Sequence, residues 1–384
     1  MRITYITHTR FPVQKAHGKQ IAEVCSAMAA LGHRVTLICP NVSNAIKIDA
    51  FTYFDIPKNF QIEKLKHADA TKQWWVPGVL HFTMNMRRYR RALSMYLKHH
   101  HSDLLYTRLP SLVPVLAATG QPVYLELHTL PKRGKKRFAK ICNRSARVIC
   151  LTTLMKQELL SRGVDRKKVI VEPDGVDLSR FKKLLGLKDA KKKAKNFPDD
   201  RPVIGYVGGL YTRQNIEKGV SVLIDALIIL KRKGIRVGGV IAGGWGKEIE
   251  EFKRQARHAG LENDILFHGH VPSVQVPLHL AACDVLVYPA PASNHPYFQR
   301  DTSPLKLFEY LAAGRPIVCA DLPPLREVVD DRTVTFFTPG DAESLAHWIL
   351  HVLKHPGEAR TKAERGHTLV QQHDWTKRME RILA

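Results

Sequence analysis

The segment DTSPLKLFEYLAAGRPIV, which begins at Asp301, carries residues whose types and order suit phosphate binding. Ser303 is a good helix N-cap, Pro304 suits the first helical position, and a later Gly-x-Pro ends the helix. A helix over 304–313 is therefore expected, with its unpaired amides facing the preceding loop. Such an N-terminus attracts anions, and Lys306 adds a full positive charge in the first turn.

Glu309 lies more than one turn into the same expected helix. Its carboxylate can accept two hydroxyl hydrogen bonds, which is what a ribose diol offers. The alternative is an ordinary surface glutamate. Its immediate neighbours are apolar or aromatic, with little other polarity, so a functional position is favoured over a solvated one.

Apolar strands alternate with helical patterns along the chain, which is typical of parallel α/β layers. The alternation begins at MRITYIT and a helix near 20–31, and it restarts at RPVIGYVGGL with helices over 220–233, 247–259 and 304–313. The fold class is therefore α/β, with two Rossmann-like doubly wound domains in tandem. In such sheets ligands bind beyond the carboxyl ends of the strands, so the loops there are the candidates.

The expected domain boundary lies in a basic segment with few apolar residues and no amphipathic repeat. We expect a first domain over 1–180, a charged linker over 181–200 and a second domain over 201–370. A last helix over 371–384 is expected to cross back to the first domain.

The formal net charge of +25 is unevenly distributed. Residues 1–150 carry an excess of 17 positive charges, whereas 201–384 carry an excess of only three. The first domain is therefore expected to meet an anionic partner. Basic clusters at 87–91 and 132–137 raise the question of nucleic acid, but no interleaved aromatic residues or known binding module accompany them, which argues against it.

A different anionic partner is suggested by the segment WWVPGVLHFTMNMRRYRRALSMYL, which begins at Trp74. Trp74, Trp75 and several aliphatic residues stand beside four arginines, a mixture that suits an anionic lipid headgroup layer. An ordinary amphipathic helix with a basic solvent face is equally consistent with the segment. Both readings stay open at this point.

The compartment is inferred from the absence of targeting signals. No apolar run has the length of a signal peptide or a membrane span, and the six cysteines lie scattered, mostly within apolar stretches. We therefore expect a cytoplasmic protein with buried thiols. If the protein attaches to the membrane, we expect it to bind peripherally at the inner face.

Asp301 and Glu309 are two acidic residues separated by seven others. This spacing, within SPLKLFEYLAAGRPIV and its preceding residues, resembles the signature of the retaining GT-B glycosyltransferases of family GT4. Other segments agree with that family in order, and together they span nearly the whole chain: KAHGKQIAEVCSAMAALGHRVTL, EPDGVDLSRF, YVGGLYTRQNIEKGVSVLIDAL, FHGHVPSVQVPLHLAACDVLVYPA and HDWTKRMERILA. The resemblance implies a GT-B fold, with two domains facing each other across a cleft.

The resemblance implies roles for the second domain. Glu309 would bind the donor ribose, Asp301 would hold hydroxyls of the transferred sugar, and Lys218 would place a cation on the diphosphate. The remaining donor-binding residues would be Ser303, Pro304, Leu305 and Lys306 at the helix start, with Gly209 and Val271.

Two positions depart from the family pattern. The family usually has Glu where Asp301 stands, which shortens the reach of the carboxylate by one methylene. It commonly has Arg in place of Gly209, so one phosphate cation is missing there, and Arg213 in a longer loop is the expected replacement.

In the first domain, Gly18 is expected to let the backbone approach a ligand closely, or to form only a tight turn. His128 ends the strand VYLELH, where the family places a histidine over the sugar. No DxD carboxylate pair stands in a strand-loop context and the family does not depend on a metal, so we expect catalysis without a metal or other cofactor.

The expected function is retaining transfer of a sugar from a nucleoside-diphosphate sugar to a glycan or lipid-linked acceptor. The implied route is departure and attack on one face, with the leaving phosphate helping to deprotonate the acceptor. A GT-B epimerase or hydrolase and a non-catalytic sugar-nucleotide-binding subunit are the alternatives. NAD binding is not expected, because GYVGGLY lacks the GxGxxG spacing.

Overall fold

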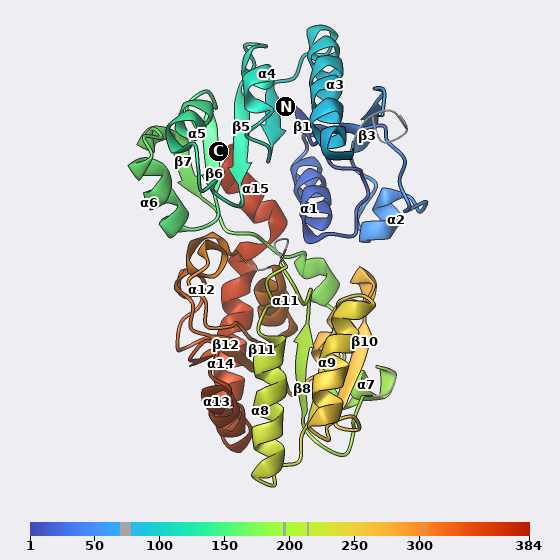
Figure 1. Ribbon diagram of the computed structural model, residues 1–384, viewed down its shortest axis with the longest axis vertical. Coiled ribbons are helices and arrows are strands. Elements are labelled where there is room, and N and C mark those ends of the chain that lie inside the picture. The colour runs from blue at the N-terminus through green and yellow to red at the C-terminus, as the bar shows by residue number, and fades with distance from the viewer. Residues whose placement is uncertain (70–77, 195–196, 213–214, 304) are drawn as a thin grey trace. The chain divides into compact units, whose positions relative to one another are not determined.

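The computed structural model describes residues 1–69, 78–194, 197–212, 215–303 and 305–384. Trp74, Trp75, Arg213 and Pro304 lie outside these described residues. The chain divides into two compact units, Met1–Pro173 with Trp375–Ala384 and Asp174–Asp374. Each unit has its own parallel sheet, and the two are described separately below (Figure 1).

The first unit is built on a seven-stranded parallel sheet in the order β3-β2-β1-β4-β5-β6-β7. The strands are β1 (Arg2–Ile6), β2 (Arg34–Pro40), β3 (Gln61–Leu65), β4 (Leu104–Thr107), β5 (Val123–Leu127), β6 (Arg147–Cys150) and β7 (Val169–Val171). The helices are α1 (Ala16–Ala30), α2 (Ala50–Phe54), α3 (Gly78–His99), α4 (Val113–Ala117), α5 (Lys135–Cys142), α6 (Thr153–Ser161) and α15 (Trp375–Leu383). The central strand β4 is buried along its whole length, as in sheets covered by helices on both faces.

The second unit has a six-stranded parallel sheet in the order β10-β9-β8-β11-β12-β13. The strands are β8 (Val203–Val207), β9 (Gly238–Ala242), β10 (Ile265–Gly269), β11 (Val285–Tyr288), β12 (Ile317–Ala320) and β13 (Thr335–Phe337). The helices are α7 (Leu187–Lys193), α8 (Val220–Arg232), α9 (Lys247–His258), α10 (Val276–Ala281), α11 (Leu305–Ala313), α12 (Pro323–Arg326), α13 (Ala342–Lys354) and α14 (Pro356–Val370). The strand order reverses between β8 and β11, so the loops after these strands border the crevice where such sheets bind ligands.

The segment expected to be an open linker, 181–200, is instead folded against the second unit over its described part. It contains helix α7, which packs against α10, and its small residues Ala190 and Ala194 are buried. Lys191 forms an ion pair with Asp284 at 2.7 Å. The run of lysines concealed this helix, because the segment adds few apolar residues to the core: Phe181, Ala190, Ala194 and Phe197, with Leu184 partly buried against it.

The last helix, α15, belongs to the first unit and packs against α1. Trp375, Met379 and Ile382 are buried, which gives the helix one apolar face with the spacing of a 3.6-residue repeat. Arg378 lies on the same buried side and is fully covered. The chain therefore returns to its first unit through a helix that carries a charge into that unit.

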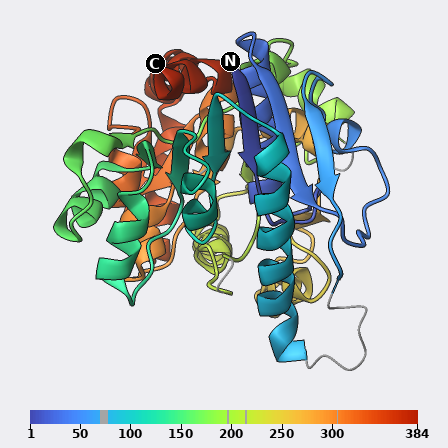
Figure 2. The same cartoon turned by 90° about the horizontal axis from the view of Figure 1, so that it is seen from above.

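Helix α3 is the longest helix of the first unit and extends past the edge of the sheet at its N-terminal end (Figure 2). Apolar side chains near that end are exposed, with Val79 at 86% and Phe82 at 63%. Further along, Tyr89 and Leu93 are buried against the sheet. Within the described parts of the chain, no helix combines the length and apolar character needed to cross a bilayer.

Gly219, the N-cap of α8, is required by both conformation and space. Its φ is +89°, and a Cβ added there would lie 2.5 Å from the amide nitrogen of Ala290, just after β11. We predict that Gly219→Ala lowers the free energy of unfolding by more than the roughly 1–3 kcal/mol that the backbone conformation alone costs, because the contact with Ala290 adds to it. Gly234→Ala is the matched control, because φ there is +72° but nothing lies within 4 Å. Equal losses in urea unfolding of the two variants would show that the contact with Ala290 is unimportant.

Candidate active site

Helix α11 is attached to the end of β8 by a buried tyrosine. The hydroxyl of Tyr310 accepts a hydrogen bond from the amide of Val207 at 2.8 Å and donates one to the carbonyl of the same residue at 3.0 Å. Val207 is the last residue of its strand, so its backbone groups are available to a side chain. This double contact holds the start of α11 beside the loop that follows β8.

Lys306, in the first turn of α11, extends across that loop. Its Nζ donates to the hydroxyl of Tyr206 at 2.9 Å and lies 4.3 Å and 4.4 Å from the ring centres of Tyr206 and Tyr288. Burial, followed by the nearby charge of Lys218, holds the pKa of the Lys306 ammonium well below its usual range. An ammonium in these surroundings gains from an added anion.

Lys218 supplies the second cation at the same loop. Its Nζ lies 3.6 Å from the position that a Cβ on Gly209 would occupy, while Cδ of Lys306 lies 3.1 Å from that of a Cβ on Gly208. The two lysines therefore border the Gly208–Gly209 backbone. Among the residues that the structure describes, no carboxylate forms an ion pair with either lysine. Two cations at one loop favour an anionic ligand, and the expected diphosphate contacts of Gly209 and Lys218 stay predictions.

Glu217, which the sequence reasoning missed, caps helix α8. Its Oε1 accepts from the amide of Val220, and its Oε2 accepts from the hydroxyl of Ser221 at 2.7 Å. The first amides of α8 are thus already paired with a carboxylate, which removes this helix N-terminus as a phosphate site. The sequence carries no standard capping signal for this residue, because a capping box has its glutamate three residues after the N-cap, whereas Glu217 stands two residues before the N-cap Gly219.

Asp301 is buried at the end of a short π-helix, Tyr297–Asp301, and its carboxylate faces the neighbouring guanidinium. Nε of Arg300 donates to one carboxylate oxygen at 2.6 Å, and Nη2 donates to the other at 3.2 Å. Each oxygen keeps further acceptor capacity, so a sugar hydroxyl can still be bound. Nothing in the local sequence singles out Arg300, because an arginine beside an acidic residue is common in surface loops.

Ser303 has a different partner from the one expected of an N-cap. Its Oγ accepts a hydrogen bond from the amide of Asp174 at 2.8 Å, which connects the start of the second unit to the loop before α11. Leu305, Glu309 and Val271 are all half-buried. The expected contacts of these residues with a donor stay predictions.

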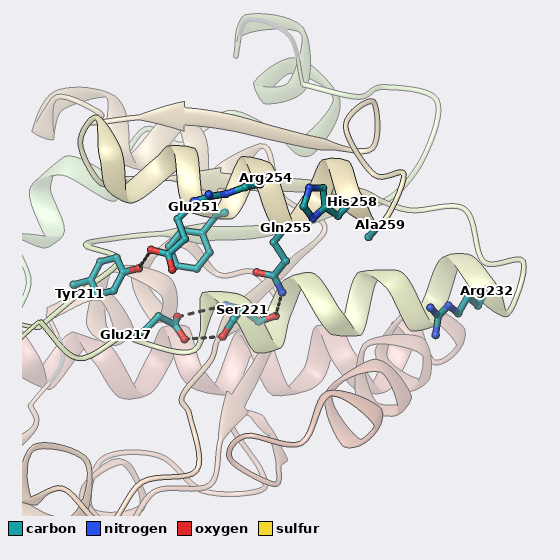
Figure 3. Close-up of a pocket in the computed structure, with 10 residues that line it drawn as sticks. Tyr211, Glu217, Ser221, Arg232, Glu251, Arg254, Gln255, His258 and Ala259 are labelled. Atoms are coloured by element: carbon teal, nitrogen blue, oxygen red, sulfur yellow. Dashed lines mark hydrogen bonds between the residues drawn. The ribbon is translucent and has the colours of Figure 1, made fainter.

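A large open hollow on the second unit lies between α8 and α9, with a volume of 760 Å³ (Figure 3). At one end Tyr211 donates to Glu251 at 2.8 Å, and Glu217 lies beside them. Arg232 stands at the opposite end. Two carboxylates at the end nearest the Gly208–Gly209 loop repel a diphosphate, so we place the candidate site at the two lysines and not in this hollow.

In the first unit, His128 follows directly after β5 and is paired with a buried carboxylate. Its Nε2 lies 2.7 Å from Oε1 of Glu126, a side chain with no exposed surface. Gly18 lies in the first turn of α1, where a Cβ would stand 2.6 Å from the carbonyl oxygen of Val13. The absent side chain of Gly18 therefore serves close packing of the helix start, and its φ is not the reason for the glycine.

Comparison with known proteins decides the family. A model described as Glycosyltransferase Family 4 matches residues 17–180, and a model described as Glycosyl transferases group 1 matches residues 188–368. The chain belongs to glycosyltransferase family 4. The first match covers the part of the chain that forms the first sheet, and the second match covers the part that forms the second sheet. Together they leave little of the chain uncovered.

Relatives of this family-4 glycosyltransferase are distant, and some of them match nearly its full length. A phosphatidyl-myo-inositol mannosyltransferase of Mycobacterium tuberculosis is 24% identical over 400 residues, covering 98% of this chain and 94% of that protein. Among solved structures, the sucrose-phosphate synthase of Thermosynechococcus elongatus has a TM-score of 0.76 at 18% identity, covering 100% of this chain and 98% of the other. Anabaena HepE in complex with UDP-glucose has a TM-score of 0.74 at 19% identity, covering 100% and 99%. The fold is therefore GT-B, as expected, and the chain is an enzyme of the glycosyltransferase class.

Proposed function

We propose that this glycosyltransferase binds a nucleoside-diphosphate sugar at the Gly208–Gly209 loop and transfers the sugar with retention of configuration. The observation that carries the proposal is the pair of lysines at a two-glycine backbone, Lys306 beside Gly208 and Lys218 beside Gly209. As the glycosidic bond breaks, negative charge accumulates on the diphosphate. Cations fixed in advance lower the barrier to that step.

The remaining donor contacts are proposed from the family resemblance, and the position of α11 beside the Gly208–Gly209 loop supports them. Glu309 is proposed to bind the ribose, Asp301 the hydroxyls of the transferred sugar, and the backbone from Ser303 to Lys306 the diphosphate. Leu305, Val271 and Gly209 complete the proposed donor set. Gly18 and His128 are proposed for the sugar and acceptor side.

We propose that the reaction needs neither a metal nor another cofactor. The two lysines supply the positive charge that a divalent cation supplies in many phosphate sites. Turnover should be unchanged after dialysis against EDTA. Loss of activity on chelation, with recovery on adding Mg²⁺ or Mn²⁺, would contradict this part of the proposal.

The test of the function uses a panel of nucleotide sugars. A ligand present at 100 times its dissociation constant raises the free energy of unfolding by about 2.7 kcal/mol, so the correct donor is recognised by thermal stabilisation. Product analysis with that donor, radiolabelled, then separates three outcomes. A new glycoside supports transfer, a free or rearranged sugar indicates a hydrolase or epimerase, and no turnover indicates a binding subunit. The anomeric configuration of a new glycoside, read by NMR, tests retention.

Lys218→Ala is predicted to weaken binding of the nucleoside diphosphate by about 1.5–3 kcal/mol, the value of a charge-assisted hydrogen bond. This corresponds to a 10- to 150-fold rise in the dissociation constant, measured by calorimetry. Lys233→Ala, which removes an exposed cation at the far end of α8, is the matched control. Unchanged affinity in Lys218→Ala would move the assignment to Arg213.

For the acceptor side, we propose that a cytoplasmic protein attaches peripherally to anionic membrane and takes a lipid-linked or anionic glycan acceptor. The support is the exposed apolar end of α3, with Val79, Leu80 and Phe82, next to the four arginines at 87–91. The M. tuberculosis relative, by its name, acts on a phosphatidylinositol.

The protein is therefore predicted to sediment with anionic vesicles at low salt, less with neutral ones, and to be released by high salt. Each Lys or Arg near an anionic surface contributes about 1 kcal/mol, so replacing Arg87, Arg88, Arg90 and Arg91 by Ser should abolish most binding. The matched control replaces Lys132, Arg133, Lys135 and Lys136, which are exposed and carry the same charge. Equal losses in both variants would show that net charge alone matters, and no sedimentation of the unaltered protein at low salt would refute membrane attachment in favour of a soluble anionic acceptor.

A further inference from the structure

Glu126, on β5 of the first unit, is a fully buried carboxylate surrounded by hydrogen-bond donors. Its Oε1 lies 2.7 Å from Nε2 of Gln20, 3.1 Å from Nη2 of Arg378 and 2.7 Å from Nε2 of His128. Its Oε2 accepts from the hydroxyl of Tyr106. Burying a carboxylate is costly unless it is paired and hydrogen-bonded, so the set of donors gathered around Glu126 requires an explanation.

The surrounding groups show which atom of His128 carries a proton. Nη1 of Arg108 lies 2.6 Å from the amide of Gln20, and a guanidinium only donates, so the Gln20 oxygen faces Arg108 and its nitrogen faces Glu126. Arg378 also only donates. Oε1 of Glu126 therefore accepts hydrogen bonds from Gln20 and from Arg378. Because this oxygen carries no hydrogen, its contact with His128 requires a hydrogen on Nε2 of the imidazole.

The C-terminal helix keeps Glu126 ionised. Arg378 has no exposed surface, and its Nε donates to the carbonyl of Pro173 at 2.6 Å while its Nη2 reaches Glu126. Burial raises the pKa of the Glu126 carboxyl, but Arg378 and the hydrogen bond from His128 outweigh it and hold that pKa well below its usual range. An ionised Glu126 can only accept from the imidazole.

We propose that Glu126 is a positioning residue that acts through His128. Its Oε1 keeps a proton on Nε2 in both the neutral and the charged ring, fixes the plane of the imidazole, and makes Nδ1 the nitrogen that titrates. Carboxylates that orient functional histidines in this way set both the tautomer and the ring direction. The catalytic consequence rests on the proposed function, in which His128 contacts the sugar.

The first test reads the tautomer by ¹⁵N NMR of protein labelled at histidine, with the His128 signals assigned from their loss in His128→Ala. In the unaltered protein Nε2 should have the shift of a protonated nitrogen throughout the titration. Tyr106→Phe removes only the contact to Oε2 and should leave this signature unchanged. An unprotonated Nε2 in the unaltered protein at neutral pH would overturn the proposal, whatever the enzyme's substrate proves to be.

The second test removes the carboxylate without leaving a buried charge unpaired. Replacing Glu126 by Leu together with Arg378 by Met exchanges an ion pair for apolar groups of similar volume, a change that proteins often tolerate. This double variant should give a mixture of the two His128 tautomers and a 10- to 100-fold lower kcat, the loss seen when orienting partners are removed. The single variant Glu126→Gln, made with Arg378 in place, retains an acceptor oxygen. It should therefore show the Nε2-protonated tautomer of the unaltered protein, in contrast to the double variant.

A double-mutant cycle separates positioning from a purely structural role. In a His128→Ala background, replacement of the Glu126–Arg378 pair should cause little further loss of kcat, because the group through which Glu126 acts is gone. The same loss with and without His128 would overturn the proposal. If His128→Ala alone leaves turnover unchanged, the assignment of His128 in the proposed function fails, while the NMR result still decides whether Glu126 fixes its tautomer.

Discussion

Glu309→Ala is expected to remove most transferase activity while the fold is retained. If the carboxylate accepts two ribose hydroxyl hydrogen bonds, each charge-assisted and worth about 1.5–3 kcal/mol, their loss lowers kcat/KM by roughly 10²- to 10⁴-fold. Glu309 is half-buried on α11, between the buried residues Phe308 and Tyr310, which provide the packing of the helix. Because these neighbours provide the packing, the variant should still fold.

The measurement pairs steady-state kinetics with a thermal melt. Glu343→Ala is the matched control, because Glu343 is an exposed helical glutamate whose ion pair with Lys233 is of the weak surface type. A donor lacking ribose hydroxyls should be used equally well by the original enzyme and by Glu309→Ala. Unchanged turnover with the full donor in a folded Glu309→Ala variant would remove this residue from the site.

Lys306→Met is expected to have effects of opposite sign on stability and on donor binding. The Lys306 ammonium is buried against Tyr206 and Tyr288 and lies near Lys218, without a carboxylate partner among the described residues. Methionine keeps the contacts with the rings and removes the charge. The free energy of unfolding should rise by about 1 kcal/mol, which raises the Tm of a domain of this size by roughly 2–4 °C.

Affinity for the nucleoside diphosphate should fall in the same variant by about 10- to 150-fold, the value of one charge-assisted contact. The pKa of Lys306 is lowered from its ordinary value of 10.5, so the folded protein binds this proton less tightly than the unfolded chain does. The stabilisation by Lys306→Met should accordingly be full below the lowered folded-state pKa and shrink as the pH rises from there, vanishing only above 10.5, where the lysine is neutral in both states.

Differential scanning calorimetry with and without UDP or GDP checks both signs. Lys233→Met, which removes an exposed cation, should change neither quantity appreciably. A variant of Lys306 that loses stability and keeps its nucleotide affinity would show that the ammonium serves the fold and not the donor.

Much of the fold could be predicted because its signals are local. The alternation of apolar strands with amphipathic helices determines two parallel α/β units, and Gly and Pro residues mark where helices end. The expected helix over 304–313 agrees with α11, Leu305–Ala313, and the helix over 220–233 agrees with α8, Val220–Arg232. The family resemblance added the fold class and the order of the segments, which the family models confirm.

The tertiary structure alone decided which charged groups meet. Lys306 and Tyr206 are 100 residues apart, and Glu126 and Arg378 are 252 apart, so no local pattern connects either pair. Lys191 and Asp284 likewise turn an apparent linker into part of a domain. Periodicity shows which face of an element is buried, but the partner of a buried charge depends on how distant elements pack, and that packing is where the lysine pair and the Glu126–Arg378 pair arise.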